Sequence, residues 1–215
     1  MKNVVLFAGL FLILSTACNK NEEPAETCTD GIQNQSETGV DCGGPCAPCP
    51  STLCDGNGST SFYPLALNNS WFYKGSGTNQ FTNTVSATAT YNSLTYYKVD
   101  NTLGGTIYLR SATNGDIMIY NPSTSSELLY VPASPTTGQT WSYPMQFSAT
   151  RKVISSSTSF STSSCTYSGC VKIQNFDASG NGKTVMYYKK GVGMVSSDEI
   201  YPGVIVTNLN TITLN

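Results

Sequence analysis

Histidine is absent from the 215-residue sequence, and charged residues make up only 11% of it. Without histidine the chain lacks the usual general base near neutral pH, the Ser-His and Cys-His nucleophile pairs, and the commonest ligand of transition metals. The net charge is −2, and the lysines and arginines are scattered, so no basic stripe exists to hold the phosphates of a nucleic acid. These absences argue against nucleic-acid binding and give nucleophilic catalysis little support.

Long apolar runs are also missing. The apolar stretch at residues 4–14 is too short for a transmembrane helix, which needs about 20 apolar residues. It follows Lys2 and leads to the small residues 15–17 and then to Cys18, so residues 1–17 are predicted to be a signal peptide. The same small residues also satisfy the cleavage rule of an ordinary soluble secreted protein, which is the alternative.

Residues 14–18, Leu-Ser-Thr-Ala-Cys, resemble a lipobox, although the leucine lies one place further from the cysteine than in the common pattern. The resemblance implies acyl chains such as palmitate on Cys18 and anchoring in a membrane. Residues 19–23, Asn-Lys-Asn-Glu-Glu, resemble the signal that sends Bacteroidetes-type lipoproteins to the surface of the outer membrane. We therefore expect a surface-exposed outer-membrane lipoprotein with a tether at residues 18–27. A plain solvated tether on a periplasm-facing or secreted protein is the alternative.

Eight cysteines in an exported chain favour disulfides over catalytic thiols. Besides Cys18, the disulfide candidates are Cys28, Cys42, Cys46, Cys49, Cys54, Cys165 and Cys170. Cys165 and Cys170 are near enough in sequence to close a hairpin loop if their Cα atoms come within about 7 Å. That pairing would leave Cys54 either bridged to one of the earlier cysteines or as a free or intermolecular thiol.

Residues 28–49 match nearly every defining position of a short cysteine-rich module, Cys-x-Asp-Gly-x-x-Asn-x-x-Glu-Thr-Gly-x-Asp-Cys-Gly-Gly-x-Cys-x-x-Cys. They resemble this module as it occurs in surface and secreted proteins of Bacteroidetes, where it implies no enzymatic role. So few residues cannot bury a core, so two bridges among the four cysteines would impose the shape of a disulfide-rich module at residues 28–54. Residues 55–61 are expected to be a linker. Three connectivities remain open.

Two metal sites compete with this interpretation of the module. Zinc on the four cysteines is a rival because Cys46 and Cys49 have ligand spacing. Calcium is the other, and its candidate ligands are Asp30, Asn34, Glu37 and Asp41. Their spacing is not that of an EF-hand loop, and acidic residues in turn-rich segments are usually just solvated. We expect no other cofactor.

Residues 62–215 are predicted to form an all-β domain, because short alternating apolar runs recur and no 3.6-residue period is found. About ten strands are expected, at residues 71–74, 85–91, 96–99, 106–110, 117–120, 128–131, 139–147, 171–176, 184–189 and 204–214. The connections, such as Gly-Asn-Gly at residues 180–182, are too short for crossover helices. We expect a curved antiparallel meander sheet, either a half-barrel or an open sandwich.

The domain also resembles a loose set of uncharacterised bacterial lipoprotein β domains. The resemblance is carried by Tyr-Pro-Leu at residues 63–65, Trp-Phe-Tyr at 71–73, Gly-Gln-Thr-Trp at 138–141, Cys-Val-Lys-Ile at 170–173, and Tyr-Tyr-Lys-Lys-Gly-Val-Gly-Met-Val at 187–195. It implies no established activity.

The remaining residues support three hypotheses about the function. A carboxylate-dependent hydrolase would use a pair among Asp100, Asp116, Glu127, Asp177, Asp198 and Glu199, most of which lie in expected turns where Asp serves the backbone. A carbohydrate- or lipid-binding module would expose tyrosines, with Tyr96, Tyr97, Tyr187 and Tyr188 as candidates, although strand aromatics are more often core. We expect a lipoprotein with a binding or structural role that is not an enzyme.

Overall fold

The computed structural model describes residues 28–29, 36, 44–46, 54, 56–75, 80–145, 148–199 and 205–215. The chain separates into two compact units, residues 1–47 and 48–215. In the first unit, a disulfide joins Cys28 to Cys46 with 5.4 Å between the Cα atoms. The other two module cysteines, Cys42 and Cys49, lie outside the described residues.

The second unit is all-β, as predicted, and its described residues contain twelve strands and no helix. The strands are β1 (Ser70–Gly75), β2 (Gln80–Tyr91), β3 (Leu94–Asn101), β4 (Thr106–Ser111), β5 (Ile117–Asn121), β6 (Ser126–Val131), β7 (Thr140–Ser142), β8 (Thr150–Ser161), β9 (Thr166–Phe176), β10 (Gly182–Lys189), β11 (Gly193–Glu199) and β12 (Ile205–Thr213). Correspondingly, no helix of the described residues has the length and apolar character needed to cross a membrane.

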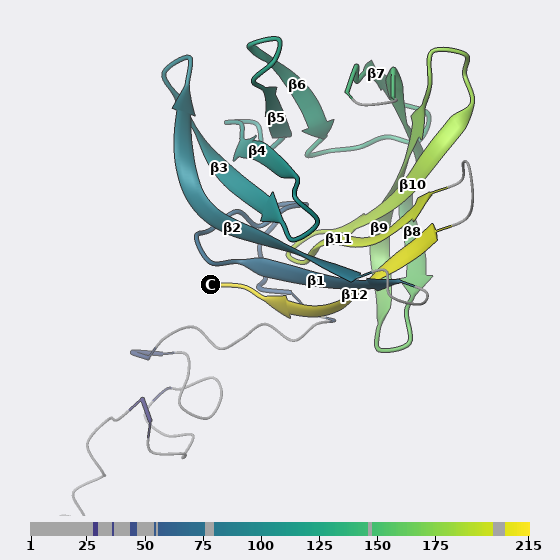
Figure 1. The fold of residues 1–215 in the computed structure, drawn as a ribbon. Coiled ribbons are helices and arrows are strands. Elements are labelled where there is room, and N and C mark those ends of the chain that lie inside the picture. The colour runs from purple at the N-terminus through teal and green to yellow at the C-terminus, as the bar shows by residue number, and fades with distance from the viewer. Residues whose placement is uncertain are drawn as a thin grey trace, which may run out of the picture. The chain divides into compact units, whose positions relative to one another are not determined.

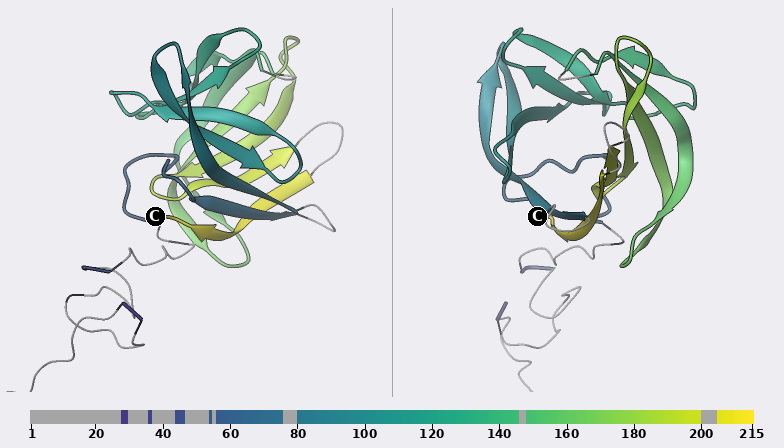
Figure 2. Two further views of the ribbon diagram at one scale, coloured as in Figure 1. Left: turned by 60° about the vertical axis from the view of Figure 1, so that its left-hand side comes forward. Right: turned by 45° about the vertical axis from the view of Figure 1, so that its right-hand side comes forward.

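All twelve strands belong to one antiparallel sheet with the order β6-β5-β4-β3-β2-β1-β12-β11-β10-β9-β8-β7. Two meanders, β1–β6 and β7–β12, are joined where the first and last strands pair. We call these the first and second wings. The wings curve toward each other, so the sheet is nearly closed and barrel-like (Figures 1 and 2). The predicted curved meander is confirmed, and β6 and β7 are its two edges.

Two strands were not expected from the sequence. The second half of β8 reads Ser-Ser-Ser-Thr-Ser-Phe-Ser, in which no apolar alternation marks a buried face. In β11 the residues from Gly193 to Ser196 are all buried, so alternation is lost there as well. Conversely, the strand expected at residues 139–147 is limited to β7, because Pro144 has no N–H to donate and the chain turns after Tyr143.

The core lies on the inner face of the sheet and draws on both wings. Its fully buried members include Tyr63, Trp71, Tyr73, Leu109, Ile117, Val153, Ile173, Tyr188, Val195 and Leu209. The Trp71 indole donates a hydrogen bond of 2.6 Å to the carbonyl of Val192, and the Tyr73 hydroxyl donates one of 2.9 Å to the carbonyl of Met194. The Trp-Phe-Tyr and Lys-Gly-Val-Gly-Met patterns, over 100 residues apart, therefore meet in one structural contact.

The disulfide of the β domain differs from the expected one. Cys54 is bonded to Cys165, 111 residues away, with 5.4 Å between the Cα atoms. Cys170 is buried as a free thiol. The pairing of Cys165 with Cys170 was therefore wrong, as was the expectation that Cys54 bridges into the module or remains unpaired. Spacing suggested the local bridge, but Cys165, directly before β9, is bonded to the segment that precedes β1.

Candidate functional site

A cavity of about 450 Å³ lies on the inner face of the curved sheet, within the range of about 300–1,000 Å³ that is usual for small-molecule sites. Both wings line it. Lining residues on several strands are two positions apart, as with Val99 and Asn101 on β3 or Ser197 and Glu199 on β11, because alternate residues of a strand share one face. The sheet therefore supplies the wall of the cavity by its ordinary geometry.

The lining mixes polar and apolar side chains. The polar ones are Asn83, Asn101, Thr106, Ser148, Arg151, Asn175, Thr184, Ser197 and Glu199. The apolar and aromatic ones are Phe81, Val99, Leu103, Ile107, Ile119, Tyr130, Tyr143, Met145, Met186 and Met194. Three methionines among them give an adaptable surface, since the unbranched thioether packs in several conformations. The cavity is thus suited to an amphipathic molecule rather than to a purely apolar one.

Arg151 on β8 is the most unusual residue of this lining, because its side chain is only 3% exposed. Its Nε donates to the Asn175 side-chain oxygen at 2.9 Å, and its Nη1 donates to the Tyr130 carbonyl at 2.7 Å. Its Nη2 lies 3.9 Å from the sulfur of Met186. All three acceptors are neutral.

Aromatic rings surround the same guanidinium. The Cζ atom of Arg151 lies 3.7 Å from the centre of the Tyr143 ring and 4.5 Å from that of Tyr130. Burial raises the pKa of Tyr143 to about 12, so this ring is neutral at physiological pH. Burial by itself lowers the pKa of Arg151, but the surrounding tyrosines outweigh it and that pKa is raised. The site therefore holds a cation that is stabilised by dipoles and ring faces.

The chain contains one other arginine, and its surroundings are different. Arg110 on β4 forms a bidentate pair with Glu127 on β6, with Nη2 2.7 Å from Oε2. Among the described residues, no carboxylate forms an ion pair with Arg151. Glu199 lines the same cavity but is exposed at its rim. The buried arginine is thus the one without a counter-charge.

The four tyrosines proposed as ligand-binding residues do not form one exposed row. Tyr96 and Tyr188 are buried, with 1% and 0% exposure, and Tyr188 is part of the core. Tyr97 and Tyr187 are half-buried and pack against the core. Tyr96 instead belongs to a tyrosine cluster formed with Tyr91, Tyr108 and Tyr120.

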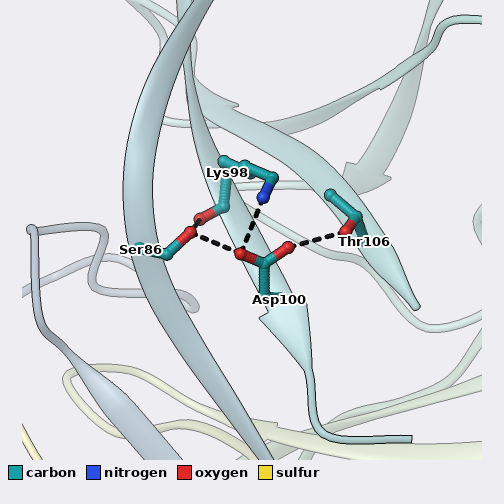
Figure 3. A network of polar contacts seen from close by, with 4 residues as sticks. All are labelled: Ser86, Lys98, Asp100 and Thr106. Carbon is teal, nitrogen blue, oxygen red and sulfur yellow. Dashed lines mark hydrogen bonds and ion pairs between the residues drawn. The ribbon is translucent and has the colours of Figure 1, made fainter. Parts of the chain in front are cut away.

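The six candidate carboxylates have mainly local partners. Asp100 accepts hydrogen bonds from Ser86 at 2.6 Å, Lys98 at 2.8 Å and Thr106 at 2.6 Å, as Figure 3 shows. These partners lower the pKa of Asp100 to about 2, with Lys98 contributing most.

The remaining carboxylates follow the same pattern. Asp116 and Asp177 accept backbone N–H groups near turns, as expected for Asp in such positions. Glu127 is paired with Arg110, and Asp198 accepts a hydrogen bond from Ser196 at 2.9 Å. Only Glu199 lines the cavity.

The structure does not describe the predicted metal ligands. Asp30, Asn34, Glu37 and Asp41, proposed for calcium, lie outside the described residues, and so does the lipid-attachment candidate Cys18. In the part of the chain that is described, no three Cys, Asp or Glu side chains converge on a metal position. The calcium site therefore stays a prediction.

Arg151 was not singled out from the sequence. Its neighbourhood, Thr-Arg-Lys-Val-Ile-Ser-Ser-Ser, opens a strand that the apolar pattern did not predict, and an arginine in an exposed strand is ordinary. The available signal was its rarity, since the chain has only two arginines. The inward direction of the side chain depends on register with β9, which sequence periodicity did not reveal.

Comparison with known proteins leaves the chain without an assigned family. No protein family matches it, and no curated protein matches it either. Two crystal structures do match. One is a "putative exported protein with YmcC-like fold" from Bacteroides fragilis, with 11% identity over 72% of this chain and 99% of that chain and a TM-score of 0.41. The other is a "putative lipoprotein" from Parabacteroides distasonis, with 17% identity over 73% of this chain and 100% of that chain and a TM-score of 0.41.

Proposed function

We propose that this chain is an exported lipoprotein of the cell envelope whose β domain binds a small molecule in the inner cavity and catalyses no reaction. The observation that carries the binding role is the cavity of about 450 Å³, which is lined by polar and apolar groups from both wings of the sheet. Sites for small molecules combine these two features, because apolar walls supply affinity and a few polar groups fix orientation.

The proposed location rests on the N-terminal sequence. The lipobox-like residues 14–18 supply Cys18 for acylation, and residues 19–23 supply the export signal to the surface of the outer membrane. The disulfide between Cys54 and Cys165 is consistent with this proposal, since such bonds persist in oxidising compartments outside the cytoplasm. Two or three acyl chains would hold the domain at the membrane without any inserted protein segment.

Binding is tested with the neutral fluorescent probe N-phenyl-1-naphthylamine and a chain carrying Cys18→Ser, which removes the lipid site. Thr184 lines the cavity, so Thr184→Trp is designed to fill it. Thr150 is exposed beside Arg151 in sequence but on the opposite face, so Thr150→Trp is the matched control.

We expect saturable binding by the parent chain and by Thr150→Trp, and loss of binding by Thr184→Trp. Circular dichroism checks that each variant retains the β fold. Equal binding by all three chains would place the probe elsewhere, and no saturable binding by the parent chain would overturn the proposed binding role.

Anchoring is tested by intact mass of protein purified from membranes, with Cys18→Ser as the control. A mass that begins at residue 18 and includes acyl chains, absent from the control, is the expected result. An unmodified mature chain that begins at Cys18 would remove the anchor from the proposal while leaving the binding role in place.

A further inference from the structure

Arg151 forms no ion pair with any carboxylate in the part of the protein that is described. Removing a cation from water is unfavourable, and burial is usually accompanied by a paired anion. Arg110 follows that rule through Glu127, whereas Arg151 is more deeply buried and bonds only to neutral acceptors. The same protein therefore contains one arginine with its anion and one without.

The guanidinium retains capacity for an acceptor. It carries five N–H groups, and its hydrogen bonds to Asn175, Tyr130 and Met186 involve three of them. The contact to Met186 is weak, because thioether sulfur is a poor acceptor. Arg151 also lines the cavity, so an anion inside the cavity could reach it.

We infer that the cavity binds an amphipathic monocarboxylate, with the carboxylate paired to Arg151 and the apolar part against Met145, Met186 and Met194. This inference rests on the proposed binding function and names its ligand class. The Tyr130 and Tyr143 rings hold the guanidinium in place, so little of its freedom is lost on binding.

The charges on the lining favour one negative charge over two. Arg151 is the only lysine or arginine among the described lining residues, and Glu199 adds a negative charge at the rim. A dianion such as phosphate would meet one cation and one repelling carboxylate, in surroundings that are about half apolar. A carboxylate with an apolar tail matches both the single cation and the methionines.

The test compares matched ligands by displacement of N-phenyl-1-naphthylamine from the Cys18→Ser chain. Decanoate is the carboxylate, 1-decanol is its neutral counterpart, and inorganic phosphate is the anion without a tail. We expect decanoate to bind about tenfold more tightly than decanol, equal to about 1.4 kcal/mol, and phosphate not to compete. Comparable binding of decanoate and decanol would overturn the role of the carboxylate, and competition by phosphate at similar concentrations would overturn the amphipathic ligand class.

Arg151→Met removes the cation and keeps an unbranched side chain, and Arg110→Met is the control at the other arginine. The preference for decanoate should disappear in Arg151→Met and persist in Arg110→Met. Retention of the preference in Arg151→Met would show that another group binds the carboxylate.

A second measurement needs no variant, in case Arg151→Met does not fold. The carboxyl carbon of bound 13C-labelled decanoate is titrated by NMR in the Cys18→Ser chain. Pairing with a cation favours the ionised form, so the pKa of the bound acid should fall below its value in water. A raised pKa would place the carboxyl in apolar surroundings and overturn the inference.

The proposed binding function and the inferred carboxylate ligand would fail in different ways. Probe binding that Thr184→Trp abolishes, combined with no preference for decanoate, would leave the cavity as a binding site and remove only the carboxylate. Failure of both the probe and decanoate to bind the folded parent chain would remove the binding function together with the inferred ligand.

Discussion

The indole of Trp141 on β7 donates a hydrogen bond of 2.9 Å to the carbonyl of Leu129 on β6. These strands are the two edges of the twelve-stranded sheet, so this bond connects its ends. Arg151 makes a second connection by donating to the carbonyl of Tyr130, the next residue of β6. Side chains thus satisfy carbonyls of an edge strand that would otherwise be open to pairing with another chain.

Replacing Trp141 with phenylalanine should weaken this closure. The change removes one hydrogen bond and part of a packed ring, so we expect the free energy of unfolding to fall by about 1–2 kcal/mol. Amide exchange should increase most in β5 and β6. Trp71→Phe is the matched control, because it also removes an indole hydrogen bond but in β1. The same exchange pattern in both variants would contradict a role specific to the edges.

Gly193 is expected to tolerate no side chain. Its φ is +110°, and a Cβ atom there would lie 2.7 Å from Nε1 of Trp71, the atom that donates to Val192. Gly193→Ala should therefore lower the free energy of unfolding by about 2 kcal/mol or more, measured by urea denaturation.

Gly180→Ala separates the cost of the positive φ from the cost of the contact with Trp71. Gly180 also has a positive φ, of +81°, but a Cβ atom there would meet nothing within 4 Å. The control should show only the backbone cost of about 1 kcal/mol. Equal losses of unfolding free energy in Gly193→Ala and Gly180→Ala would mean that the contact with Trp71 contributes nothing.

The sequence patterns that predicted this fold were those set by local chemistry. Turns such as residues 180–182, and alternating strands such as β2, follow from the neighbours of each residue, and they gave the antiparallel meander. The Trp71 and Gly193 motifs could be recognised but not connected, because their contact joins residues far apart in the chain.

The candidate site was not predicted for a related reason. A cavity depends on how far the sheet curves and on which side chains both wings direct inward, and these are properties of long-range register. Arg151 lies on β8, whose run of Ser and Thr residues lacks the apolar alternation that would mark a buried face. The disulfide between Cys54 and Cys165 was equally inaccessible, since spacing favoured a pairing of Cys165 with Cys170.

Cys170 should behave as an inert thiol in the folded protein. Burial raises its pKa to about 11, so the reactive thiolate is scarcer at pH 8 than for an ordinary cysteine with a pKa of about 8.5. We expect iodoacetamide at pH 8 to leave Cys170 unmodified until urea is added, as followed by peptide mass. In urea without reductant, Cys54 and Cys165 should remain unlabelled. An unlabelled Cys170 in urea would instead indicate that it is in a disulfide.

Acid should weaken the network around Asp100. Its pKa is lowered to about 2 by Lys98, Ser86 and Thr106, against about 3.9 in the unfolded chain. A lowered carboxyl pKa contributes stability that is fully present above pH of about 4 and is lost as the pH falls toward 2. Because the Asp100 and Lys98 side chains are 35% and 37% exposed, water screens the pair, and the loss should be below about 1 kcal/mol.

Asp100→Asn tests this assignment by urea denaturation between pH 7 and pH 2. The variant should be slightly less stable at pH 7 and should lose less stability than the parent chain below pH of about 4, because the titrating group is gone. Lys98→Gln is the companion variant, since it removes the largest cause of the lowered pKa but leaves the carboxyl able to titrate. Its acid loss should therefore be smaller than that of the parent chain and be complete at a higher pH, because the unfolded-state pKa that sets its onset is unchanged. If Asp100→Asn retains the full acid dependence of the parent, other carboxylates such as Asp177 determine it and the network in Figure 3 does not.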